Sequence, residues 1–111
     1  MCPVLELAEI VLAPGTQAEF ERAFEQAQRV VAQAPGFRGL QLWHSVERPD
    51  VYRLLISWDT VEAHTQGFRE SALFVEWRRL IGGYFAQPPS VEHGTLVAET
   101  GGEPAPAGSP P

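Results

Sequence analysis

Hydrophobic and polar positions along the chain predict an alternation of strands and helices. Residues 4–12 are rich in aliphatic side chains and lead into Ala13-Pro14-Gly15, which predicts a strand closed by a turn. Thr16 and Glu19 have the spacing of a helix capping box, and apolar residues then recur at helical period. The predicted helix ends at Pro35-Gly36, because this pair stops helical geometry.

The second half of the chain predicts a hairpin, another helix and a last strand. Residues 37–46 alternate in part and residues 51–58 are strongly apolar, so two antiparallel strands with a short connection are expected. A helical region follows from Asp59 to Ile81, opened by a second capping pattern that begins at Asp59 and interrupted near Gly67. After a proline-containing loop, alternation returns and predicts a final strand over residues 90–99.

The resulting order, β-α-β-β-α-β, predicts an α+β, ferredoxin-like fold with a four-stranded antiparallel sheet. Two helices cover only one face of such a sheet. Both sides of the predicted strands nevertheless carry large apolar residues, since Trp43 faces opposite to Leu42 and Leu55 faces opposite to Leu54. A second copy packed sheet against sheet would cover the exposed side, so a homodimer is expected.

The length of 111 residues suits one domain, which we place at residues 2–99. Residues 100–111 are rich in Pro, Gly and Ala and have no large apolar side chain. Nothing in this segment offsets the entropy of ordering the backbone, so a disordered tail is expected.

Charge and cysteine content narrow the class of protein. The formal net charge of -6 opposes binding to nucleic acid and to anionic membranes. Cys2 is the single cysteine, which rules out an internal disulfide and suits a reducing compartment. With no secretory pattern at the start and no apolar run of roughly 20 residues, a cytoplasmic protein is expected.

The stretch from Trp58 to His93 resembles the antibiotic biosynthesis monooxygenase family. The matching features are a tryptophan that ends the third strand, an acid-rich helix start, the Phe68-to-Ser71 segment and a closing strand after a Pro-rich loop. The resemblance extends over about residues 4–98. It implies a dimeric α/β barrel and a monooxygenase that needs no cofactor and oxidises an aromatic or quinol-type small molecule with O2.

Haem degradation, known in some members, is less favoured. Those members use an asparagine on the first strand, and a tryptophan and a histidine on the later helix. Here the first strand has no asparagine, and residues 71–81 contain Trp77 but no histidine. No two histidines have the spacing of a metal pair on one helix, so neither a metal nor any other cofactor is expected.

His64 and His44 are the candidate catalytic residues, because oxygenation without a cofactor requires a group that removes a substrate proton. The alternative for His64 is a solvated or capping residue at the start of a helix. The alternative for His44 is a residue of the sheet face or the dimer contact. His93 is interpreted as structural, because the family resemblance places this position near the subunit contact.

Aromatic side chains are the candidate lining of a substrate pocket, with core packing as the alternative. The six candidates are Trp43, Trp58, Phe68, Phe74, Trp77 and Tyr84. Residues 82–89 are the candidate flap over this pocket. Arg53 and Arg69 are candidates for holding an anionic group, although ion pairing with nearby glutamates is the simpler interpretation.

Two classes of function follow. The first is a monooxygenase-like enzyme whose partner is a small aromatic or apolar substrate. The second is a non-catalytic dimeric module that binds a small hydrophobic ligand or serves in a stress response. The absence of a distinctive catalytic cluster in the sequence favours the second, and the family resemblance favours the first.

Overall fold

The structure is a computed structural model that describes residues 3–101. Its elements are β1 (Val4–Val11), α1 (Gln17–Val31), β2 (Phe37–His44), β3 (Val51–Trp58), the π-helical segment η1 (Ala63–Phe68), α2 (Ala72–Ile81), the short 3-10 turn η2 (Gly82–Tyr84) and β4 (Ser90–Gly94). The predicted β-α-β-β-α-β order is confirmed, including the interruption of the second helical region near Gly67. Cys2 and residues 102–111 of the predicted tail lie outside the described residues.

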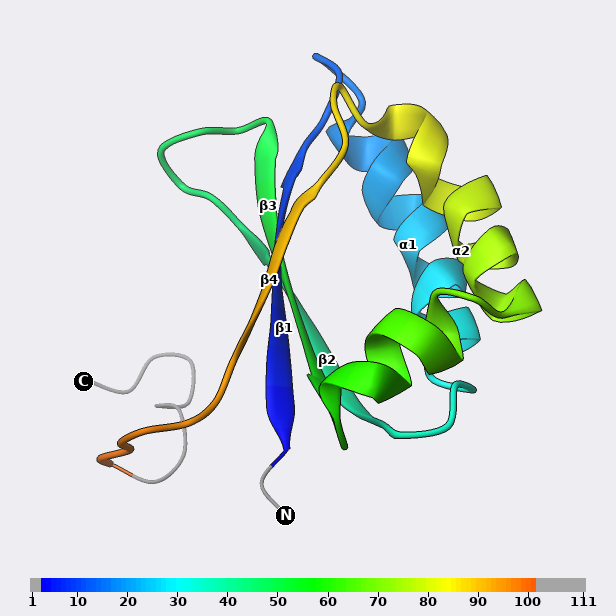
Figure 1. Cartoon of the computed structure of the whole chain (residues 1–111). Coiled ribbons are helices and arrows are strands. Elements are labelled where there is room, and N and C mark those ends of the chain that lie inside the picture. Colours follow the sequence, from blue (N-terminus) through cyan, green and yellow to red (C-terminus); the bar gives the residue numbers. More distant parts are fainter. Residues whose placement is uncertain (1–2, 102–111) are drawn as a thin grey trace.

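The four strands form one antiparallel sheet in the order β2-β3-β1-β4. Figure 1 shows that α1 and α2 lie on the same side of this sheet and that neither covers the other side. The predicted α+β, ferredoxin-like fold is therefore confirmed. No helix within residues 3–101 has the length and apolar character needed to cross a membrane.

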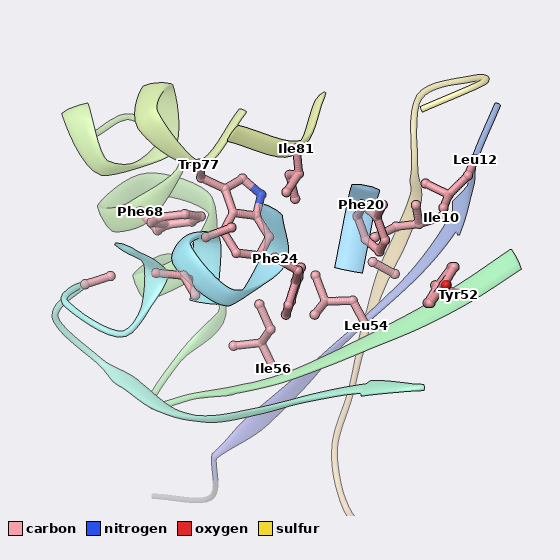
Figure 2. Close-up of a cluster of buried hydrophobic side chains, with 14 of the residues drawn as sticks. Ile10, Leu12, Phe20, Phe24, Tyr52, Leu54, Ile56, Phe68, Trp77 and Ile81 are labelled. Carbon is pink, nitrogen blue, oxygen red and sulfur yellow. The ribbon is translucent and has the colours of Figure 1, made fainter. Parts of the chain in front are cut away.

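The core lies between the sheet and the two helices, as Figure 2 shows. α1 presents Phe20 and Phe24 to the sheet, and α2 presents Trp77 and Ile81. Alternate residues of β1 and β3 point toward these helices, because side chains of a strand alternate between its faces. Burying a large apolar side chain contributes about 1.5–3 kcal/mol, so this layer supplies most of the stability.

The turn between α1 and β2 requires a glycine at position 36. Gly36 has a φ of +87°, a conformation that side chains rarely adopt, and a Cβ there would lie 2.7 Å from the Cβ of Ala63. This close approach brings the start of η1 against the turn and fixes where the segment containing His64 meets the sheet.

Both predicted capping patterns differ from the observed ones. The Thr16 hydroxyl donates to the Ala13 carbonyl at 2.7 Å and makes no cap on α1, because it stabilises the preceding turn instead. At the second helical region Thr60, not Asp59, accepts the backbone N–H of Ala63 at 3.0 Å. In both places the polar contact differs from the predicted one, and the helical segment still forms.

Three strands are shorter than predicted, and β1 is so by Leu12 alone. β2 ends at His44, where the chain turns and Ser45 N–H bonds to the Val51 carbonyl at 2.9 Å. β4 ends at Gly94, because Gly94 already pairs with Leu5 near the start of β1 and little of β1 remains to pair with further residues. The predicted alternation of residues 95–99 therefore does not form a strand.

Candidate active site

A cavity of about 520 Å³ lies between the helix-facing side of the sheet and α2. Its walls are contributed by β1, β3, η1, α2, the segment that follows α2, and β4. The apolar lining includes Ile10, Leu54, Ile56, Phe68, Trp77 and Ile81. Figure 2 shows Trp77 and Ile81 pointing from α2 toward Leu54 and Ile56 of β3. A mostly apolar cavity with a few polar groups is typical of a small-molecule site.

Glu6 brings a carboxylate into this cavity from β1. Its side chain shares the helix-facing side of the strand with Ala8 and Ile10, and only 5% of the residue is exposed. Trp58 Nε1–H donates to Glu6 Oε1 at 2.9 Å. Burial raises the pKa of Glu6 above its ordinary value, while the Trp58 hydrogen bond and the charge of Arg69 act in the opposite direction.

His64 reaches the same carboxylate from η1. The backbone N–H of Arg69 bonds to the His64 carbonyl at 2.9 Å, which closes a wide π-helical turn and leaves His64 and Phe68 both buried. His64 Nε2 lies 3.3 Å from Glu6 Oε1, and the imidazole stacks on the Trp58 indole with ring centroids 5.4 Å apart. Burial lowers the pKa of His64 to about 4, helped by the charges of Arg69 and His93.

His93 continues this chain of polar groups toward the solvent. It lies opposite Glu6 in the pairing of β4 with β1, and its Nε2 is 2.8 Å from Nδ1 of His64. One ring must donate and the other must accept in this contact, whichever tautomers are present. The three residues Glu6, His64 and His93, which we call the proton relay, connect the cavity to a partly exposed position on the edge strand.

A profile of the antibiotic biosynthesis monooxygenase family matches residues 3–80. The chain belongs to this family. Glu6 and His64 lie within the matched residues, whereas His93 lies beyond them.

Individual proteins and solved structures are also similar to this chain. The uncharacterized protein YczJ of Bacillus subtilis (strain 168) is 37% identical over 90 residues, which cover 81% of this chain and 95% of YczJ. A Bordetella bronchiseptica structure classed with the antibiotic biosynthesis monooxygenases is 41% identical, with a TM-score of 0.86, and the match covers 88% of this chain and 100% of the other. SnoaB, a cofactor-independent oxygenase from Streptomyces nogalater, shares the fold at 21% identity and a TM-score of 0.69, covering 93% and 100%.

Four of the residues predicted for the site line the cavity of this family member. They are His64, Phe68, Phe74 and Trp77. Trp58 lies directly behind the cavity, fully buried, and acts on it through the hydrogen bond to Glu6. The predicted catalytic role of His64 and the predicted binding roles of the aromatic residues stay predictions.

The other three predicted residues lie away from the cavity. His44 stacks on Tyr52 with centroids 4.2 Å apart, and its Nε2 contacts the Pro49 carbonyl at 2.8 Å. Trp43 is 56% exposed on the uncovered sheet face. Tyr84 packs edge-on against Phe20, with centroids 6.4 Å apart. The cavity and these three residues are therefore separate features of the fold.

Glu6 was not among the residues predicted from the sequence, although the pattern contained a signal. Glu6 falls on the same alternating face of the first strand as Ala8 and Ile10, whereas Glu9 falls on the opposite face. A carboxylate on the apolar side of a strand is expected to be buried, and buried carboxylates are costly unless they are bonded. No comparable local pattern in the sequence indicated the contact between His64 and His93.

Within residues 3–101, no group of three or more His, Cys, Asp or Glu residues is arranged to hold a metal ion. His64 and His93 are in direct hydrogen-bond contact with each other.

Stability should depend on pH through His64. Because the pKa of His64 in the folded protein is about 4, against an ordinary 6.5, the unfolded chain binds this proton more readily. His64 therefore leaves the free energy of unfolding unchanged above pH 6.5 and lowers it progressively as the pH falls toward 4. Glu6, whose pKa is raised, changes the free energy of unfolding in the opposite direction. Comparing the wild type with His64→Gln, which keeps Glu6, isolates the contribution of His64.

Urea unfolding of both proteins measures the effect. Between pH 7 and pH 4 the wild type should lose about 3 kcal/mol more unfolding free energy than His64→Gln does. Equal losses in the two proteins would show that His64 titrates normally in the folded state.

Proposed function

We propose that this chain is a cofactor-independent monooxygenase that oxidises an aromatic C–H acid or quinol-type compound with O2. The observation that carries the proposal is the proton relay, which opens into an apolar cavity large enough for an aromatic molecule. Family membership supports monooxygenase activity in general terms. The cavity geometry supports the finer statement about the substrate.

Glu6 acts as the base in the first step. Its carboxylate removes a proton from the acidic CH2 group of an anthrone-type substrate, which leaves an electron-rich carbanion. The raised pKa of Glu6 makes this carboxylate a stronger base than an exposed one. His64 and His93 then offer a path by which the proton leaves toward the edge of the sheet.

The carbanion supplies all the electrons for the reduction of O2. One electron passes to O2, the two radicals combine to form a C–O bond, and the resulting peroxide takes up a proton. Loss of water from the peroxide gives the ketone, so that the CH2 group and O2 yield a C=O group and H2O. The CH2 carbon loses four electrons and O2 gains four, which balances the reaction without a metal or an external reductant.

Oxygen uptake tests the proposal. Protein treated with a chelator should consume one O2 for each anthrone-type molecule converted, with incorporation of one 18O atom into the ketone from 18O2. A panel of reduced quinols offered under the same conditions maps the substrate range. If no compound is consumed while an apolar dye binds the cavity, the non-catalytic ligand-binding module becomes the better description.

The uncovered sheet face supports the expected homodimer as part of the same proposal. Leu7 and Leu55 lie opposite each other in the pairing of β1 with β3, on the side away from the helices. Trp43 adds an exposed indole to this face. Burial of such a surface by a second copy is favourable, so sedimentation at micromolar concentration should give roughly twice 12.2 kDa. A single-chain mass would contradict the dimer.

A further inference from the structure

Two arginines bring positive charge to the wall of the cavity. Arg69 follows η1 and Arg78 lies on α2, and both line the cavity while their side chains remain accessible to solvent. Among the lining residues in the described part of the chain there is no other arginine and no lysine. In a chain of net charge -6, this local positive charge is opposite to the overall balance.

These two arginines differ from most of the others in their partners. Arg38 pairs with Asp59, Arg48 and Arg53 pair with Glu9, and Arg79 pairs with Glu76. Across residues 3–101, neither Arg69 nor Arg78 forms an ion pair with a carboxylate. Because the chain has more acidic than basic residues, two guanidinium groups without such a partner at one cavity suggest that their partner is a ligand.

Local packing holds one of these groups in place. The Arg78 guanidinium lies over the Phe74 ring, 5.9 Å from its centroid, and Phe74 itself lines the cavity. A planar guanidinium fixed on an aromatic wall presents its N–H groups for a two-point contact with a carboxylate.

Glu6 limits where an anionic ligand can place its charge. Its buried carboxylate would repel a second carboxylate, whereas Arg69 and Arg78 would attract one. The acid group of a ligand is therefore expected beside the two guanidinium groups, with its aromatic body among the apolar lining residues.

We propose that the cavity binds an aromatic carboxylic acid, whose carboxylate is held by Arg69 and Arg78 while its ring system fills the apolar interior. The proposal rests on the proposed function only for the chemistry at Glu6. Recognition of the carboxylate by the two arginines stands on the cavity itself.

Matched probes that cannot be oxidised test recognition alone. 2-Naphthoate and 2-naphthamide have the same ring system and differ in charge, and calorimetry gives the affinity of each. The wild type should bind the naphthoate about tenfold more tightly than the amide, in line with two partly exposed charge contacts. Raising the salt concentration should reduce this preference, because exposed charges are screened.

Variants identify the residues responsible. Arg69→Gln/Arg78→Gln should reduce the preference for the naphthoate to about twofold or less and leave amide binding unchanged. Arg79→Gln is the matched control on the same helix, since Arg79 pairs with Glu76 and does not line the cavity, and it should keep the full preference. Equal affinity of the two probes in the wild type, or an undiminished preference in the double variant, would overturn the proposal.

The test separates this inference from the proposed activity. Charge-dependent binding without any oxygen uptake would support the carboxylate site and count against the monooxygenase. Oxygen uptake with neutral substrates, together with no preference for the naphthoate, would support the enzyme and overturn the carboxylate site.

Discussion

Replacing Glu6 by glutamine is expected to slow oxygen uptake by about 10²- to 10³-fold, because the substitution removes the proposed base and keeps the size of the side chain. The glutamine oxygen can still accept the hydrogen bond from Trp58 Nε1, so the fold should remain. Steady-state oxygen consumption with an anthrone-type substrate gives kcat and KM separately. The loss should fall on kcat, since the role proposed for Glu6 is at the reacting carbon rather than in ring binding.

Glu9→Gln is the matched control for this variant. Glu9 lies on the same strand but on the opposite face, where it pairs with Arg53. Its replacement should leave oxygen uptake within about twofold of the wild type, because an exposed ion pair contributes little. If both variants were equally active, Glu6 would not be the base.

Trp58→Ala is expected to lower the free energy of unfolding by about 3–5 kcal/mol, as large truncations in a core do. Trp58 has no exposed surface and packs edge-on against Phe37, with centroids 6.0 Å apart. It also stacks on His64 and contacts Phe68. The truncation would remove these contacts and leave the buried Glu6 carboxylate without its indole donor.

Urea unfolding followed by circular dichroism measures this loss. Trp58→Phe should cost clearly less, because it keeps an aromatic ring and removes only the N–H group and part of the volume. Val75→Ala, at a position 69% exposed on α2, should change the unfolding free energy by at most about 0.5 kcal/mol. A loss below about 1 kcal/mol for Trp58→Ala would show that the indole does not organise this part of the core.

The order of elements could be predicted from the sequence because it depends on local periodicity. Alternation with period two marks β1 and β3, and the stripe of Phe20, Phe24 and Ala27 marks α1. The end of β4 could not be predicted in this way. Its alternation continues beyond Gly94, and only the pairing of Gly94 with Leu5 shows that almost no residue of β1 remains to pair with a longer strand.

The site was partly predictable for a related reason. His64 and Phe68 are four residues apart, so a shared side could be inferred for them, whereas Trp77 lies on the separate helix α2. The contact of His64 with His93 depends on the order of strands in the sheet, which joins residues 29 positions apart. His44 and His93 look alike in the sequence, and only the strand order separates the one that reaches His64 from the one that does not.

The position of His93 on β4 has a consequence for the way the protein responds to heating. β4 has five residues, lies at the edge of the sheet and pairs with β1 alone. Short edge strands open more easily than the packed interior does. Mild heating is therefore expected to separate His93 from His64 while the aromatic interior stays intact, so that the proposed activity would decline below the melting temperature.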